Sequence, residues 1–173
     1  MSSMRWYIAA PVFFAAFIIQ VSLPSGAGLW GYSPNLLLCM TCVFSFLYKE
    51  PYGLIMGAVF GALLDVATSW YFGPQAISFV IAFLIARPFG KVFNHEWFLP
   101  QIIIAAIATP INVFLMWGMG RLAGGLTHIR FALEPLPALL IMHCALAVVL
   151  HFIFVRTIIR HGIDRKYYGE IMM

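Results

Sequence analysis

The chain has 173 residues, of which 63% are hydrophobic and only 9% are charged, and its formal net charge is +4. An ordinary soluble domain is about a quarter charged, so this composition excludes a soluble globular protein and indicates a single integral membrane domain over residues 1–173. The positive charge does not indicate nucleic-acid binding, because no surface that combines basic and aromatic residues lies outside the apolar segments.

Short polar or Pro/Gly breaks divide the chain into six apolar segments, each of which we predict to be a transmembrane helix. In chain order the helices are expected at about residues 7–23, 34–48, 51–67, 74–90, 97–119 and 135–159. The second, third and fourth are short, about 22–26 Å against a hydrocarbon core of about 30 Å. Short helices imply local thinning of the bilayer or protein neighbours that shield their ends. The expected fold class is therefore an all-α, polytopic membrane protein.

The basic residues are distributed unevenly between the two sides of a six-helix model. Eight of the ten lie on one side, and only Arg121 and Arg130 lie on the other. The positive-inside rule places the more basic side in the cytoplasm. Both termini are then expected in the cytoplasm, with the loops 24–33, 68–73 and 120–134 facing outward. The first segment also has features of a cleavable secretory signal, but it is equally consistent with a retained helix.

The third segment carries three glycines and a carboxylate at a spacing of four residues: Gly53, Gly57, Gly61 and Asp65. Residues four apart share one face of a helix, so this glycine stripe forms a shallow groove that another backbone can approach closely. Two interpretations are open, namely packing within this chain and docking of a separate transmembrane helix. Asp65 lies near the outer end of its helix, where we expect it to be half hydrated and able to pair with Arg121 or Arg130.

The cysteines and histidines do not form a catalytic or metal-binding pattern. Cys39, Cys42 and Cys144 lie in apolar segments without the exposed, electropositive surroundings of a redox site, so we interpret them as small core residues. His143 and His151 are eight residues apart on the last segment and are expected to be core or interfacial histidines hydrogen-bonded to neighbours. Without a paired acid or a nucleophile and base, we expect no enzymatic activity, no cofactor and no metal.

Three patterns in the first half of the chain occur together in one protein family. Residues 34–38 read Pro-Asn-Leu-Leu-Leu at the start of a short helix, residues 49–51 form a basic Lys-Glu-Pro turn, and Gly73-Pro74 follows the glycine helix. Together with the six apolar segments, these patterns resemble the bacterial rod-shape-determining protein family MreD. That family usually has aspartate where this chain has Asn35, which supplies no charge but can still cap the helix.

The resemblance implies a non-enzymatic subunit of the cell-elongation complex in the bacterial inner membrane. It implies that the chain binds the bitopic protein MreC and helps to couple cytoplasmic MreB filaments to peptidoglycan synthesis by RodA and its transpeptidase. It also implies a helical fold similar to the substrate-binding subunits of energy-coupling-factor transporters. The residues expected to bind a partner or to pack helices are Gly53, Gly57, Gly61, Asp65, Pro34 and Asn35.

An alternative function is that of a substrate-binding membrane subunit of a small-molecule (vitamin) transporter. In that case Pro110, Asn112 and Asp65 would lie near the ligand, because a proline kink with polar neighbours can line a cavity. Such subunits typically dock their energy-coupling partner through small residues four apart on the first helix. The alanines of that helix do not have this spacing, which disfavours the alternative: Ala9, Ala10, Ala15 and Ala16.

Overall fold

The computed structural model describes residues 6–24, 28–47, 52–68, 72–94, 97–124 and 128–160. These residues form helices joined by short loops. The helices are α1 (Trp6–Ser22), α2 (Leu36–Leu47), α3 (Tyr52–Thr68), α4 (Pro74–Val92), α5 (Leu99–Leu122), α6 (Arg130–Leu133) and α7 (Leu136–Arg160), with the 3-10 turn η1 at Leu29–Gly31.

The six helices predicted from the apolar segments are confirmed as α1 to α5 and α7, with every end within three residues of its predicted position. The fold is therefore all-α and consistent with a polytopic membrane protein. The turn η1 and the single-turn helix α6 were not predicted. Both lie in loops between apolar segments, where the sequence has no helical periodicity of sufficient length.

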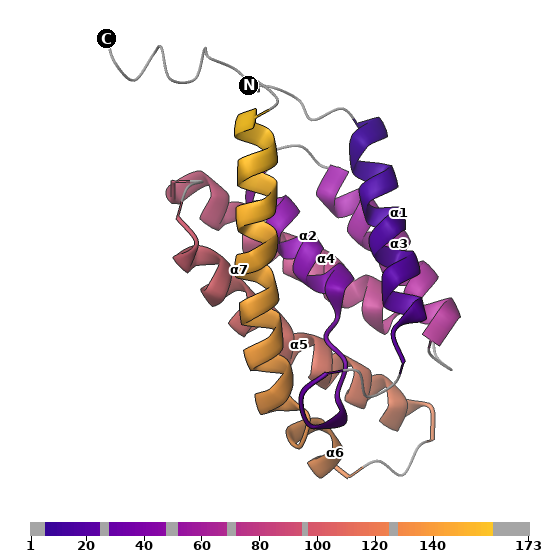
Figure 1. The fold of residues 1–173 in the computed structure, drawn as a ribbon. Coiled ribbons are helices and arrows are strands. Elements are labelled where there is room, and N and C mark those ends of the chain that lie inside the picture. Colours follow the sequence, from indigo (N-terminus) through magenta and orange to yellow (C-terminus); the bar gives the residue numbers. More distant parts are fainter. Residues whose placement is uncertain are drawn as a thin grey trace.

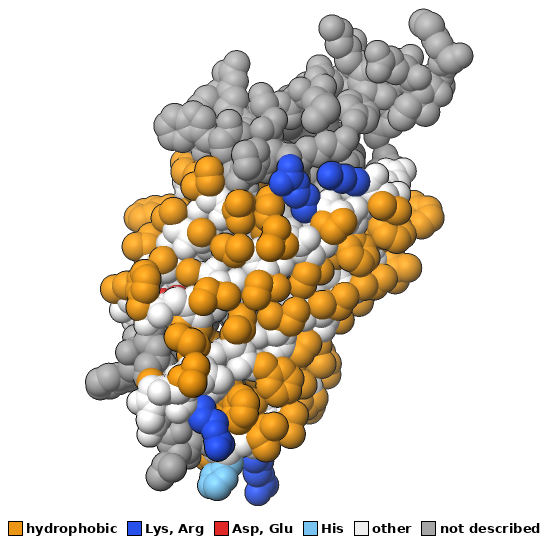
Figure 2. Space-filling view, turned by 180° about the vertical axis from the view of Figure 1, so that it is seen from behind, with side chains coloured by type: hydrophobic (Ala, Val, Ile, Leu, Met, Phe, Trp, Pro, Cys, Tyr) orange, Lys and Arg blue, Asp and Glu red, His pale blue; other side chains and the backbone are white. Residues whose placement is uncertain are grey.

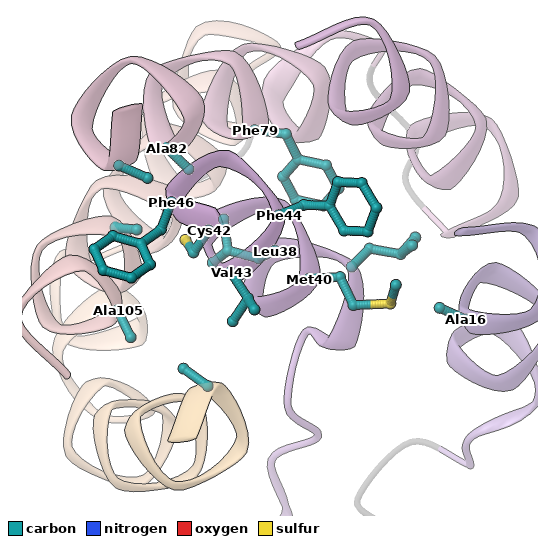
Figure 3. Close-up of a cluster of buried hydrophobic side chains, with 14 of the residues drawn as sticks. Ala16, Leu38, Met40, Cys42, Val43, Phe44, Phe46, Phe79, Ala82 and Ala105 are labelled. Carbon is teal, nitrogen blue, oxygen red and sulfur yellow. The ribbon is translucent and has the colours of Figure 1, made fainter. Parts of the chain in front are cut away.

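The short helix α2 lies at the centre of the bundle (Figure 3). It is surrounded by α1, α3, α4, α5 and α7. Its residues from Leu37 to Phe46 are all buried. Around it, α1 packs on α3, α3 on α4, α4 on α5, and α5 on α7. Of the two explanations for short helices, shielding by protein neighbours therefore applies to α2. Its 12 residues require no thinning of the bilayer, because Leu36 and Leu47 at its two ends pack against the core of the bundle.

Aromatic side chains connect the central helix to the outer ones. The ring of Phe44 on α2 meets Phe13 of α1 at a centroid distance of 5.3 Å and Phe154 of α7 at 5.4 Å, both edge to face. Lipid tails are as apolar as these side chains, so close van der Waals packing stabilises the bundle more than the transfer of apolar surface out of water does.

The bundle has two distinct ends (Figure 1). At one, which we call the terminal end, α1 begins and α7 ends; at the other, the loop end, lie η1 and α6. The face seen in Figure 2 is largely apolar between the two ends, and its lysine and arginine side chains lie near the ends. Within the described residues, three segments are long and apolar enough to cross a membrane: Pro74–Val92, Leu99–Leu122 and Arg130–Arg156.

Candidate functional site: a buried polar network near the loop end

The glycine stripe of α3 faces the interior of the bundle. A Cβ atom added at Gly57 would lie 3.0 Å from the Cγ2 atom of Thr41, and one added at Gly53 would lie 3.2 Å from the hydroxyl oxygen of Ser45. Thr41 and Ser45 are four residues apart on α2 and are both buried. The two glycines therefore allow α2 to pack closely against α3.

Gly61 makes the closest approach, and it does so to the backbone of α4. A Cβ atom at this position would lie 2.7 Å from the Cα atom and 2.9 Å from the backbone nitrogen of Ala76. Real Cβ atoms essentially never come so close to backbone. Of the two interpretations of the stripe, packing within the chain is the one that these contacts support, since α2 and α4 occupy the groove.

The carboxylate of Asp65 accepts hydrogen bonds from three backbone amides at the start of α4. Its Oδ2 atom accepts from Gly73 at 3.0 Å and from Ala76 at 3.2 Å, and its Oδ1 atom accepts from Gln75 at 3.0 Å. The first amides of a helix have no partner within the helix, and the helix dipole favours a negative charge there. Asp65 therefore fixes the start of α4 to the end of α3.

The expectation that Asp65 is half hydrated is wrong, because its side chain has 0% of its surface exposed. The reason is the close approach at Gly61, one helical turn earlier, which brings the start of α4 over the carboxylate. An ion pair with Arg121 or Arg130 stays a prediction. One observed contact of Arg121 is the ring of Trp117, whose centroid lies 5.8 Å from the guanidinium carbon.

The start of α2 is capped by side chains from two parts of the chain. The Oδ1 atom of Asn35 accepts the backbone N–H of Leu38 at 3.0 Å, which confirms the predicted cap. The side chain of Gln20, on α1, accepts the N–H of Leu36 at 2.6 Å and donates to the carbonyl oxygen of Pro34 at 3.2 Å. These bonds satisfy backbone groups at the start of α2 that have no partner within the helix itself.

The amide of Gln75 joins three helices. Its Oε1 atom accepts from the Nδ2 atom of Asn35 at 3.0 Å and from that of Asn112, on α5, at 2.8 Å. Asn112 also donates to the hydroxyl of Ser78 at 3.0 Å. Because the backbone of Gln75 bonds Asp65, the amide cluster is continuous with the α3–α4 contact.

His143 completes this polar network from α7. Its Nε2 atom accepts the backbone N–H of Asn35 at 2.8 Å, and its Nδ1 atom lies 2.9 Å from the hydroxyl oxygen of Thr109, which itself donates to the carbonyl oxygen of Ala105. The geometry assigns the proton to Nδ1. The prediction that His143 is a core histidine hydrogen-bonded to neighbours is confirmed, and His151 is likewise buried.

The network brings together some of the residues expected from the sequence and adds others. It joins Asn35, Asp65 and Asn112, and Pro34 contributes its carbonyl oxygen. Gln20, Gln75 and Ser78 were not singled out, although amide side chains inside apolar segments are themselves an unusual signal. The hydrogen bonds of this network join groups on different helices of the same chain, so the network holds these helices together.

The cysteines belong to the core. Cys39 and Cys42 are buried and Cys144 is partly buried. The thiol of Cys39 donates to the carbonyl oxygen of His143 at 3.7 Å, and that of Cys144 to Ile102 at 3.8 Å. Among the described residues, no group of three His, Cys, Asp or Glu side chains is placed to hold a metal ion.

Two substitutions at Asn35 separate the role of its side-chain oxygen, which caps α2, from that of its side-chain nitrogen, which donates to Gln75. Asn35→Asp keeps the cap on Leu38 and is expected to change the free energy of unfolding by less than about 1 kcal/mol. This requires the side-chain amides of Gln75 and Asn112 both to reverse, so that Gln75 donates to both neighbours and Asn112 accepts from Gln75 and Ser78. Asn35→Leu removes both bonds and is expected to cost about 1–3 kcal/mol. Unfolding of the purified protein in mixed detergent micelles measures both, and equal losses would contradict the cap.

The protonation of His143 is open to a direct spectroscopic test. In protein labelled with ¹⁵N-histidine, solid-state NMR at neutral pH is expected to show a His143 ring that carries its proton on Nδ1 and an unprotonated Nε2. The variant His143→Phe assigns the signal. A proton on Nε2 would contradict the bond from Asn35.

Comparison with known proteins places the chain in a family. A family model described as rod shape-determining protein MreD matches residues 1–160. A comparison with curated proteins and one with solved structures each returned no match. The expected likeness to energy-coupling-factor transporter subunits therefore stays a prediction. Because the family model covers most of the 173 residues, this chain belongs to the MreD family of rod shape-determining membrane proteins.

Proposed function

We propose that this chain is a non-enzymatic subunit of the cell-elongation complex in the bacterial inner membrane. In this role it binds the transmembrane helix of MreC and helps to couple MreB filaments to peptidoglycan synthesis by RodA and its transpeptidase. Family membership supports the proposal. The structural observation that supports it concerns Asp65. The carboxylate of Asp65 accepts hydrogen bonds from three backbone amides of its own chain, as expected of a scaffold residue.

The partner helix binds at a lipid-facing side of the bundle. The glycine stripe, for which docking of a separate helix was one of two interpretations, is occupied by α2 and α4. Large apolar side chains are exposed on the outer helices, among them Phe14 on α1, Val59 on α3, Phe114 on α5 and Phe152 on α7. In a bilayer such surfaces are open to lipid or to another transmembrane helix.

Depletion of the protein from its rod-shaped host tests the role in cell shape. Depleted cells are expected to become round, and a plasmid copy of the wild-type gene is expected to restore rods. Gly118→Ala serves as the matched control variant, because a Cβ atom at Gly118 meets nothing within 4 Å, and it should restore rods equally well. Cells that stay rod-shaped after depletion would refute the proposed function.

Site-specific photo-cross-linking tests the binding of MreC and locates it. A photoreactive phenylalanine analogue is placed, one at a time, at Phe14, Val59, Phe114 and Phe152, which lie on four different helices and are 38–55% exposed. Cross-links to MreC are expected from one side of the bundle and from few of the four positions. If none of the positions cross-links while each variant stays in the membrane, direct helix binding is refuted.

We also propose that both termini lie in the cytoplasm. The first and last helices have their outer ends at the same end of the bundle (Figure 1). The basic residues Arg87 and Lys91 lie in the last turns of α4, which run toward that end. A green fluorescent protein fused after Met173 is expected to fluoresce, and alkaline phosphatase fused at the same place is expected to be inactive. The opposite pair of results would reverse the orientation.

A further inference from the structure

One buried amide side chain is not part of the polar network near the loop end. Gln101 lies in the first turn of α5 and has 0% of its surface exposed. Within the part of the chain that the structure describes, neither its side-chain nitrogen nor its side-chain oxygen has a hydrogen-bond partner. An amide side chain has two N–H groups that donate and an oxygen that accepts, so the hydrogen-bonding capacity of the Gln101 side chain is unused.

Gln101 belongs to the face of α5 that meets α7. Ala105 and Thr109 follow it at intervals of four residues, which places the three on one side of the helix, and all three are buried. The hydroxyl oxygen of Thr109 lies 2.9 Å from the Nδ1 atom of His143 on α7. The side chain of Gln101 therefore points to the interior of the bundle and away from the lipid.

The neighbouring rings of α5 and α7 place Gln101 in a definite layer of the bundle. Three residues before it, Phe98 packs on Phe152 of α7, with ring centroids 6.0 Å apart. Next to Phe152 in the chain is His151, which is 0% exposed. The centroid of the His151 ring lies 6.1 Å from that of Phe46, near the end of α2. The layer thus holds aromatic rings and two buried polar side chains, those of Gln101 and His151.

Apolar side chains separate Gln101 from the polar network. Ala105 on α5 and Ala147 on α7 are buried in the hydrophobic core together with Phe46. Ala105 lies one turn after Gln101, and the network begins one turn further on, at Thr109. The buried amide of Gln101 therefore forms a separate polar site between α5 and α7.

The chemistry of this site favours water as its ligand. A buried polar group without a hydrogen bond destabilises a folded protein, and nearly all such groups in native structures are bonded to protein or to bound water. An internal water typically makes about three hydrogen bonds. The Gln101 amide can both donate to it and accept from it. Because the amide is neutral and none of its surface is exposed, water suits the site better than an ion or a larger ligand does.

The position of the site gives water a short path to it. Gln101 is the third residue of α5, so it lies near one end of that helix. Trp97, just before the helix, is 57% exposed, as is typical of tryptophan at the boundary between lipid and water. Water molecules are therefore available within a few ångströms along the helix axis.

We propose that the side chain of Gln101 binds water between α5 and α7, at a site separate from the polar network. The contact between the two helices is then held in two ways. Around Thr109 and His143 it is held by hydrogen bonds within the chain, and around Gln101 it is held through an exchangeable molecule. This property goes beyond the role in cell elongation and does not depend on MreC.

Solid-state NMR of the protein in lipid bilayers tests the proposal, by measuring how fast magnetisation passes from water to side-chain amides. The matched control is Asn112, a buried amide on the same helix. Its Nδ2 group donates to protein twice, to Gln75 at 2.8 Å and to Ser78 at 3.0 Å. Both hydrogens of this control are therefore bonded within the chain.

Both signals can be assigned in the unmodified sequence, so no variant has to fold. Gln101–Ile102 is the only Gln–Ile step in the chain, and Asn112–Val113 is the only Asn–Val step. Protein made with ¹³C,¹⁵N-labelled glutamine and asparagine and ¹⁵N-labelled isoleucine and valine therefore identifies the two residues and their side-chain amides.

Transfer from water to the side-chain amide of Gln101 is expected to be at least about twofold faster than transfer to that of Asn112. Exposure alone predicts the opposite order, because Asn112 is 7% exposed and Gln101 is 0% exposed. Equal or slower transfer to Gln101 would overturn the proposal, and so would a direct hydrogen bond between its amide and the ring of His151. The sample contains no MreC, so either result would leave the proposed function in cell elongation intact.

Discussion

Asp65→Leu is expected to lower the free energy of unfolding by about 3 kcal/mol or more. The substitution leaves the amides of Gly73, Gln75 and Ala76 without their acceptor, and the carboxylate that it removes is fully buried. Each buried donor without a partner costs about 1–3 kcal/mol. Reversible unfolding in mixed micelles or the yield of folded protein in membranes measures the loss.

Two further variants show whether this loss comes from the hydrogen bonds. Asp65→Asn keeps one acceptor oxygen, so its loss is expected to be intermediate. Val66→Ala changes the next residue, which is 72% exposed, and is expected to stay within about 0.5 kcal/mol of the wild type. Full stability of Asp65→Leu would show that Asp65 does not hold α4.

Gly61→Ala is expected to cost about 2–3 kcal/mol, although alanine favours helices more than glycine does. The added Cβ atom would meet the Cα and nitrogen atoms of Ala76, and backbone cannot move aside as the end of a side chain can. The two helices have to separate, which also lengthens the bonds to Asp65. Gly57→Ala should cost less, because its nearest neighbour is the methyl group of Thr41.

The matched control for the glycine variants is Gly118→Ala on α5. Nothing lies within 4 Å of a Cβ atom at this position, so the substitution should be neutral or stabilise the protein by about 0.5–1 kcal/mol. The unfolding measurements used for Asp65 apply here. If Gly61→Ala is as stable as Gly118→Ala, α3 and α4 are not as close as the structure indicates.

The helices could be predicted from the sequence because membrane segments have a simple physical requirement. A run of apolar residues must satisfy its backbone hydrogen bonds internally, so the runs and their polar breaks give the helix ends to within three residues. The cap at Asn35 was also predictable, because a side-chain oxygen just before a helix can accept a hydrogen bond from a backbone N–H of the first helical turn.

The neighbours of each helix could not be predicted in the same way. The spacing of Gly53, Gly57 and Gly61 shows that they share one face, but periodicity does not say which helix that face meets. The same limit applies to Asp65. Its oxygens and the amide donors of α4 come together only after α3 and α4 pack, so its position near a helix end predicts more hydration than the carboxylate has.

The enclosed position of α2 has a consequence for how the protein is made. Its 12 residues span about 18 Å, so this segment cannot cross a bilayer of about 30 Å as an independent helix. The backbone N–H of Asn35 donates to the side chain of His143, which is synthesised 108 residues later. The second helix to leave the ribosome therefore reaches its final bonding only when the last helix arrives, and membrane insertion and folding of this protein are completed together.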